Sequence, residues 1–144
     1  NYPKENYSHK KYSTEDYIAV CATSHQFNKE PHTIHDLISE HLLVREEGSG
    51  TRNILEQSLI AHGLHISNFI HYTQVENMHT IMNLLKKDCG ISFLYKIAVE
   101  KELKSKELKE ITLDDFKLQH DFDIIWEKES IYADKYLSIS EEFI

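Results

Sequence analysis

One short polar segment carries residue types that bind small anions. Residues Glu46–Arg52, which read EEGSGTR, follow an apolar run and precede a stretch with helical spacing. Gly48 and Gly50 allow the backbone to turn sharply and to approach a ligand closely. Ser49 and Thr51 place hydroxyls beside the N–H groups of a helix start, an arrangement that suits a carboxylate, sulfate or phosphate. From spacing alone, a helix cap at Ser49 or Thr51 is the more frequent use of such residues, and an anion site is the alternative.

The same segment lacks the spacing of three better-known loops. A Walker loop needs Gly-Lys-Ser/Thr, whereas Gly50 is followed by Thr51. A dinucleotide fingerprint needs a third glycine at the position that Asn53 occupies. A hydrolase elbow has the pattern G-x-S-x-G, whereas Ser49 lies directly between two glycines. The segment therefore belongs to none of these motif classes.

Two later positions stand where a predicted strand gives way to a helix. Asn77 occupies one such junction and is an expected helix N-cap. Ser92 and Phe93 lie at another, and strand ends of this kind face one cleft in open parallel sheets. From the sequence alone, plain core packing is the favoured interpretation of Ser92 and Phe93.

The ten histidines raise the question of a metal site. Two pairs are three residues apart: His32 with His35, and His62 with His65. No HExxH motif, CxxC motif or carboxylate triad accompanies them, and a zinc site needs three or four ligands. We therefore expect solvated surface histidines, no metal and no cofactor.

The two cysteines do not make a disulfide framework, so a reduced, cytoplasmic chain is the simpler expectation. Cys21 falls in an apolar run and is expected in the core, whereas Cys89 stands at a helix end with partial exposure. The sequence pairs neither thiol with a base, so it offers no catalytic residue.

Composition and charge restrict the class of protein. A chain of 144 residues, 40% hydrophobic and 28% charged, fits one soluble domain or two small lobes. Its 24 acidic and 16 basic residues give a net charge of -8, which argues against this chain gripping a nucleic-acid backbone by itself. No apolar run approaches the ~20 residues of a membrane span. Asn1 is not followed by an apolar signal region, so we expect no signal peptide and a chain that begins inside a longer protein.

Strand and helix patterns alternate along the chain. The expected strands cover residues 17–22, 41–45, 68–75, 91–94, 108–113 and 121–126. The expected helices cover residues 33–40, 51–62, 77–87, 97–103 and 138–144, with Gly63 ending the second of them. This alternation predicts an α/β domain with a mostly parallel sheet flanked by helices.

The motifs, taken in order, resemble a known family. The sequence REEGSGTR at Arg45–Arg52 resembles the effector-binding domain of LysR-type transcriptional regulators. Further similar stretches follow in the family's order: HGL at 62–64, VEN at 75–77, DCGISFLYKIAVEKEL at 88–103 and LKEITLDDFKLQHDFDIIWEKE at 108–129. Upstream, YIAVCATSHQF and TIHDLISEHLLV resemble the family's first strand of this region and the helix before the loop. The match covers nearly the whole chain from Tyr12 onward.

The resemblance implies a fold like the type II periplasmic binding proteins, with two α/β lobes and an effector between them. It implies that residues 1–16 connect from a first lobe preceding Asn1 and that residues 17–118 form the second lobe. Residues 119–144 then hold a returning strand and a C-terminal tail. The family's winged helix-turn-helix is not in this sequence, so the parent protein binds DNA only through a domain absent from this chain.

The resemblance also implies a site and a function. An anionic metabolite is expected at Ser49, Gly50 and Thr51, with Ser92 and Phe93 from the facing strand end. The expected function is effector binding and oligomerisation within a bacterial LysR-type regulator, without catalysis and without a membrane partner. Two alternatives stay open: a subunit-interaction module with no small ligand, and a solute-binding or enzyme domain of the same fold.

The C-terminal tail generates a first prediction. Its apolar residues, which in the resembled fold pack on the first lobe, are Phe122, Ile124, Ile125, Trp126, Tyr132, Tyr136, Leu137, Ile139, Phe143 and Ile144. Without that lobe this apolar surface is exposed to solvent, which favours binding to a partner. An unpaired strand edge favours association as well, because it can pair with another strand. We predict that the chain forms a symmetric homodimer through this tail. Light scattering at high micromolar concentration should give a dimer for the chain and a monomer for a version ending near Leu118, and a strictly monomeric full chain contradicts the prediction.

Overall fold

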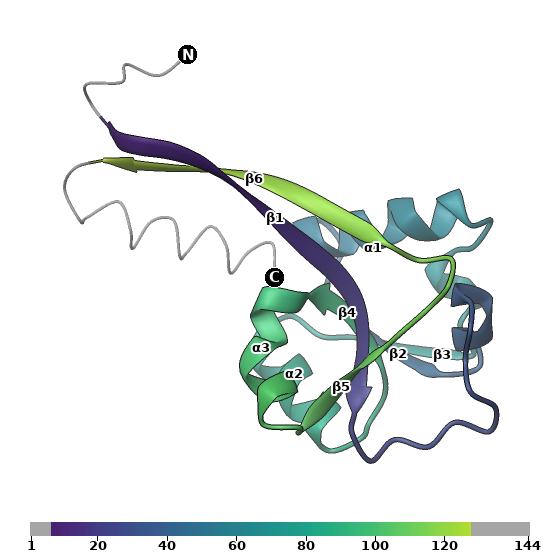
Figure 1. The fold of residues 1–144 in the computed structure, drawn as a ribbon. Helices are drawn as coiled ribbons and strands as arrows, with labels where there is room; N and C mark the ends of the chain where they lie inside the picture. Colours follow the sequence, from purple (N-terminus) through teal and green to yellow (C-terminus); the bar gives the residue numbers. More distant parts are fainter. Residues whose placement is uncertain (1–6, 128–144) are drawn as a thin grey trace.

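The central element of the fold is the long strand β1 (Tyr7–Ala22). In this computed structural model, which describes the backbone of residues 7–127 and the side chains of residues 14–119, β1 pairs antiparallel with three other strands. β4 (Ser92–Tyr95) and β5 (Leu108–Ile111) flank its C-terminal part, and β6 (Leu118–Glu127) pairs with its N-terminal part. Figure 1 shows β1 and β6 extending from the body of the molecule as a two-stranded ribbon.

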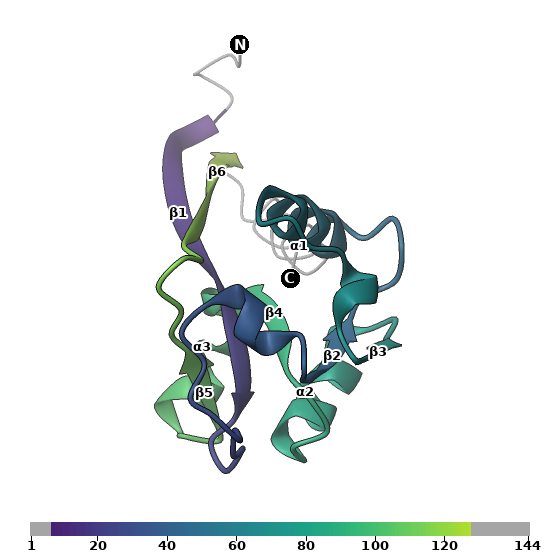
Figure 2. The same cartoon turned by 90° about the vertical axis from the view of Figure 1, so that its right-hand side faces the viewer.

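Two shorter strands continue the sheet beyond β4. β2 (His41–Val44) and β3 (His71–Gln74) pair in parallel, and a parallel bridge between Leu42 and Ile91 joins β2 to the start of β4. The order across the sheet is therefore β3-β2-β4-β1-β5 (Figure 2). Every strand of the described chain except β1 points the same way. The predicted parallel arrangement is thus confirmed for β3, β2 and β4, whereas the antiparallel pairings of β1 with β4, β5 and β6 are not expected from the sequence.

Helices cover both faces of this sheet. α1 (Gly50–Ala61) follows β2, α2 (Met78–Lys86) follows β3, and α3 (Lys96–Lys104) follows β4. Buried residues of α1 join one apolar cluster, and those of α2 and α3 join a second. One face therefore packs under α1 and the other under α2 and α3, which is the layered α/β arrangement that the alternating pattern predicts.

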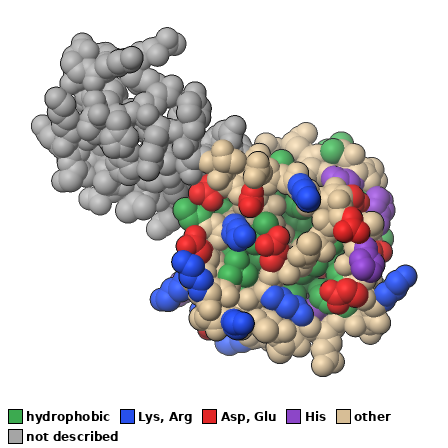
Figure 3. Space-filling model, viewed as in Figure 1, with side chains coloured by type: hydrophobic (Ala, Val, Ile, Leu, Met, Phe, Trp, Pro, Cys, Tyr) green, Lys and Arg blue, Asp and Glu red, His purple; other side chains and the backbone are tan. Residues whose placement is uncertain are grey.

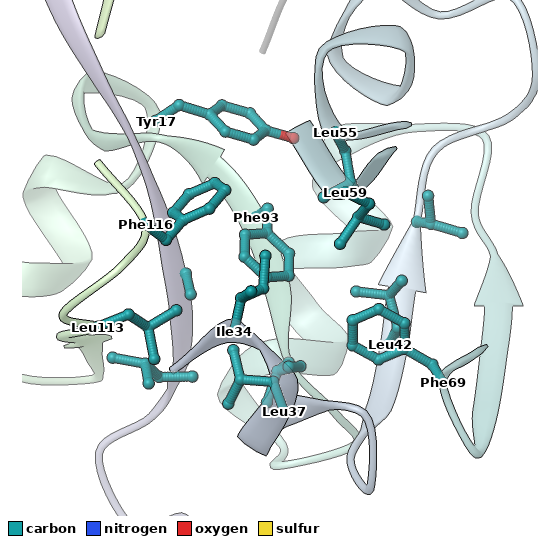
Figure 4. Packing of buried hydrophobic residues seen from close by; sticks show 14 of the residues in the cluster. Tyr17, Ile34, Leu37, Leu42, Leu55, Leu59, Phe69, Phe93, Leu113 and Phe116 are labelled. Atoms are coloured by element: carbon teal, nitrogen blue, oxygen red, sulfur yellow. The ribbon is translucent and has the colours of Figure 1, made fainter. Parts of the chain in front are cut away.

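The side chains of β1 alternate between the two clusters. Tyr17, Ala19 and Cys21 belong to the first cluster, and Ile18 and Val20 belong to the second. Successive side chains of a strand point to opposite faces, so a strand covered on both faces reads as a continuous apolar run. Figure 4 shows the first cluster, including Tyr17, Leu55, Leu59, Phe93 and Phe116.

The expected helix ends are confirmed at two positions. Asn77 is the N-cap of α2, where its side-chain oxygen accepts a hydrogen bond of 2.7 Å from the Thr80 N–H. Gly63 follows α1 with a φ of 74°, a left-handed conformation that glycine adopts without strain. The Leu64 N–H then donates to the Leu59 carbonyl at 2.8 Å, as in a Schellman motif.

Two predicted elements are wrong in type or length. The helix expected over residues 33–40 is a single 3-10 turn, η2 (Ile34–Leu37), closed by i→i+3 bonds from the Asp36 N–H to the Thr33 carbonyl and from the Ile38 N–H to the His35 carbonyl. The strand expected over residues 68–75 shortens to β3, because a second 3-10 turn, η3 (Ile66–Asn68), precedes it and Phe69 turns into the core.

The first strand begins earlier than expected, while the assignment of residues 1–16 as a connector from a first lobe stays a prediction. Most of the segment 1–16, expected as a polar connector, belongs to β1, which begins at Tyr7. Its polar sequence shows no apolar alternation, and the strand arises from backbone pairing with β6 at the other end of the chain. The helix expected at 138–144, and the tail beyond Glu127, lie outside the described residues.

Gly90 allows β4 to approach β2. A Cβ atom built on Gly90 would lie 2.6 Å from the His41 carbonyl oxygen and 3.2 Å from the Leu43 side chain. The neighbouring Ile91 N–H donates to that same His41 carbonyl at 2.8 Å. A side chain at this position therefore clashes with the bond that joins the two parts of the sheet.

We predict that Gly90→Ala lowers the free energy of unfolding by about 1–3 kcal/mol, the usual cost of overpacking. Urea denaturation followed by circular dichroism measures the change. The matched control is Gly63→Asn, because nothing lies within 4 Å of a Cβ there and asparagine tolerates a left-handed backbone. Equal stability of the two variants would show that β4 can shift away from β2 without cost.

Candidate functional site

The predicted anion segment forms the N-terminal turn of α1. Ser49 is the helix N-cap, and its Oγ accepts a hydrogen bond of 3.4 Å from the Arg52 N–H. The Asn53 N–H donates to the Ser49 carbonyl at 3.0 Å, and Gly48 makes the turn with a φ of 91°. Ser49 therefore does cap the helix, as the spacing favours. The first-turn N–H groups point out of the end of α1, as they do in any α-helix.

Thr51 connects this turn to the centre of the fold. Its side chain is buried, and its carbonyl accepts a hydrogen bond of 3.2 Å from the Tyr17 hydroxyl. Burial, followed by the effect of neighbouring Tyr95, raises the pKa of Tyr17 well above its usual value. The phenol therefore keeps its proton and remains a donor. Burial also raises the pKa of Tyr95 to about 12.

Ser92 and Phe93 are buried at the start of β4. The Ser92 hydroxyl donates to the Leu43 carbonyl at 2.8 Å and so ties β4 to β2. The Phe93 ring packs edge-on against Phe116 at a centroid distance of 5.3 Å. The core-packing interpretation therefore describes the observed contacts of both residues.

Three of the five predicted residues nevertheless come together. Thr51, Ser92 and Phe93 line one narrow crevice between α1 and the ends of β2 and β4, together with Tyr17, Leu43, Val44, Arg45, Arg52, Leu55 and Leu94. We call this space the α1 crevice. Its volume of about 10 Å³ admits one water molecule at most. Ser49 and Gly50 do not line it. Because the space is so small, a ligand larger than a water molecule can contact only the mouth of the α1 crevice.

Two arginines at the α1 crevice are missing from the sequence-based site. The side chain of Arg45 is 12% exposed, and its Nε donates to Glu46 Oε1 at 3.0 Å. This contact holds the pKa of Glu46 below its usual value. The side chain of Arg52 is 7% exposed, and its Nη1 donates to the Arg45 carbonyl at 3.0 Å. Arg45 and Arg52 stand directly before and after the sequence EEGSGT. These flanking cations were the sequence signal that could have placed both residues at the site.

Two histidines have structural contacts rather than the solvated positions expected. The His25 ring lies between two carboxylates, with Nε2 at 2.7 Å from Glu40 and Nδ1 at 2.6 Å from Asp88. The His62 ring lies between two backbone carbonyls, those of Ser58 and Asp115. Among residues whose side chains are described, no group of three His, Cys, Asp or Glu is placed to hold a metal ion.

The cysteines lie where the sequence places them. Cys21 is buried, and burial raises the pKa of its thiol to about 12, which makes it a poor nucleophile. Cys89 is exposed. Within the described part of the chain, no helix is both long and apolar enough to cross a bilayer.

The family follows from comparison with known proteins. Residues 3–132 match the family model of the LysR substrate binding domain. The chain belongs to this family. It is 30% identical over 108 residues to the HTH-type transcriptional regulator CbbR of Rhodospirillum rubrum. The aligned region covers 75% of this chain and 35% of that protein. The LysR-domain chain thus spans about a third of the length of the curated relatives it matches.

Solved regulatory and effector-binding domains share the fold. The Synechocystis PCC6803 CcmR regulatory domain in complex with 2-PG aligns with a TM-score of 0.63 at 20% identity, over 96% of this chain and 68% of that one. The effector-binding domain of QuiR in complex with shikimate aligns with a TM-score of 0.61 at 15% identity, over 93% and 65% of the two chains. The expected fold, like that of type II periplasmic binding proteins, is confirmed.

His62 generates a prediction about pH. Its Nδ1 lies 2.9 Å from the Ser58 carbonyl and its Nε2 lies 2.7 Å from the Asp115 carbonyl. Carbonyls only accept, so both bonds form only when both ring nitrogens carry protons. Hydrogen bonding to Ser58 and to Asp115 therefore raises the pKa of His62 above its ordinary value of 6.5. Asp115 belongs to the segment that connects β5 to β6, so the bonds join the end of α1 to this connection.

The raised pKa means that His62 stabilises the folded chain fully below pH 6.5, and that this stabilisation disappears as the pH rises through the higher folded-state value. We predict that His62→Gln lowers the free energy of unfolding by about 1 kcal/mol at pH 5.5, the value of one net hydrogen bond, and by less at pH 8.5. Urea titrations at both pH values measure the difference. The surface variant His79→Gln is the control, and an equal loss for His62→Gln at both pH values contradicts the assignment.

Proposed function

We propose that this chain is the effector-binding lobe of a bacterial LysR-type regulator and that it holds a small anionic metabolite at the N-terminus of α1. One observation carries the proposal: the N-terminal turn of α1 stands between two largely buried arginines, Arg45 and Arg52, at the mouth of the α1 crevice. Regulatory domains with the same fold are described in complex with 2-PG and with shikimate.

Electrostatics supports an anion over a neutral ligand. The N-terminus of a helix carries a partial positive charge and presents N–H donors. The Arg45 guanidinium is balanced by Glu46, whereas Glu47 and Glu56 stay 3.7 Å and 3.6 Å from the Arg52 guanidinium. Both guanidinium groups are thus ion-paired with glutamates, and the helix N-terminus is the feature of the mouth that favours an anion. Because the α1 crevice itself holds no more than a water, the metabolite rests at its mouth and is covered by a second surface, that of the first lobe.

Recognition of DNA belongs in this proposal to another part of the parent protein. The relatives are named HTH-type regulators and are about three times as long as the matched region. The net charge of this chain is -8. On the face seen in Figure 3, Lys and Arg side chains are interspersed with Asp and Glu. Nucleic-acid surfaces instead gather basic residues.

A subunit-contact function is the second candidate. Ile60 of α1, Ile70 just before β3 and Tyr72 of β3 are each at least half exposed. Ile60 and Tyr72 border a groove of about 390 Å³ between α1 and β3, with Arg52, Glu56, Gln57, His65, Ile66 and Ser67. Exposed apolar side chains around a groove favour protein contacts. This face is an alternative to the C-terminal tail as the surface for self-association.

The test of the anion site uses Thr51→Val, which removes the hydroxyl and keeps the shape of the side chain. If the hydroxyl binds the ligand, calorimetric titration with 2-PG and with inorganic phosphate should show affinity weakened by about 1.5–3 kcal/mol, the value of a hydrogen bond to a charged group. Thr51→Ser, which keeps the hydroxyl, should bind like the original chain. Equal affinity of Thr51→Val and the original chain would reduce Thr51 to a structural residue of the helix start.

A further inference from the structure

The side chain of Arg52 lies beneath the Glu46–Thr51 turn, which contains the proposed anion site, and reaches away from it. It is 7% exposed, and its Nη1 is shared between two neutral oxygens. One belongs to the Arg45 carbonyl, at 3.0 Å, and the other is Gln74 Oε1, at 3.2 Å. Arg45 directly follows β2, and Gln74 is the last residue of β3. The guanidinium therefore fastens the first turn of α1 to the ends of two strands.

The carboxylates near this guanidinium form longer ion pairs with it, at 3.7 Å for Glu47 and 3.6 Å for Glu56. Glu47 and Glu56 lie beyond hydrogen-bond distance, and their side chains are 84% and 42% exposed. The buried Nε of Arg52 has no hydrogen-bond partner among the described residues. The nearest counter-ion of this Nε is Glu56 Oε2, at 3.6 Å. The contacts to Arg45 and Gln74 are thus the ones that fix the side chain.

The backbone of Arg52 closes the turn from the other side. Its N–H donates to Ser49 Oγ, while its side chain binds the carbonyl seven residues earlier, at Arg45. The segment between them is therefore tied at both ends. A planar guanidinium can span two acceptors in fixed directions, whereas a lysine ammonium cannot reproduce this geometry.

We infer that Arg52 is a positioning residue of the anion site, which holds the Glu46–Thr51 turn closed against the ends of β2 and β3. It acts on a ligand through the placement of Ser49 and Thr51. The effect on a ligand rests on the proposed function, whereas the effect on the turn exists without any ligand.

Amide hydrogen exchange on the ligand-free chain tests the positioning role. In Arg52→Lys and Arg52→Gln, the amides of Ser49, Arg52 and Asn53 should exchange about tenfold faster, because their protection depends on the closed turn. The amides of β1 should be unchanged. A merely structural role would instead accelerate the turn and β1 together, and that result overturns the inference.

Milder variants keep the test decisive if the Arg52 variants do not fold. Gln74→Ala removes one acceptor from an exposed side chain, and it should accelerate exchange in the same turn by about threefold. Gln57→Ala, the matched control, truncates an exposed glutamine of α1 instead, and it should leave exchange in the turn unchanged. Unchanged exchange in Gln74→Ala, or equal acceleration in Gln57→Ala, contradicts the positioning role.

A second arm separates this inference from the proposed function. Titration of the original chain with 2-PG and inorganic phosphate tests the proposed function. Absence of binding overturns that function. The hydrogen-exchange result then decides the role of Arg52 by itself. If the original chain binds, Arg52→Lys should bind about tenfold more weakly despite its retained charge. Equal binding by Arg52→Lys overturns the effect on the ligand.

Discussion

The fold depends on one buried strand that runs against its neighbours. The part of β1 from Tyr17 to Ala22 is at most 7% exposed and lies between β4 and β5. Its alternating side chains enter two separate apolar clusters, one under α1 and the other under α2 and α3. Each helix layer therefore has an intact core only while β1 occupies the middle of the sheet.

The same strand determines where the Glu46–Thr51 turn lies. Tyr17, at the point where β1 passes from the sheet into the ribbon with β6, bonds to the Thr51 carbonyl. β4 is fixed beside β1 by pairing, and Ser92 ties it to β2. Because β2 leads directly into the turn, its position follows from these contacts and from the guanidinium of Arg52. The proposed effector site is thus a consequence of how the sheet is joined, and the glycines of the turn only permit its shape.

Local signals in the sequence predicted much of this arrangement, and long-range pairing explains what they missed. The run YIAVCA indicates a strand buried on both faces, and Asn77 and Gly63 indicate helix ends, because each depends on neighbours in sequence. The N-terminal half of β1 has a polar sequence and becomes a strand only through distant β6. The roles of Arg52, His25 and His62 also depend on partners far along the chain. Thr51, Ser92 and Phe93 were expected at one site and do line one crevice, but Ser49 and Gly50 do not.

The central claim is that a small anion binds at the N-terminus of α1 and not elsewhere on this lobe. The most direct measurement is a two-dimensional amide NMR titration of the chain with 2-PG, repeated with inorganic phosphate. Binding at the N-terminus of α1 should give saturable shifts concentrated at the amides of Ser49–Asn53 and at Ser92. Shifts that gather instead at the lysines of α3, or none at millimolar ligand, would contradict it.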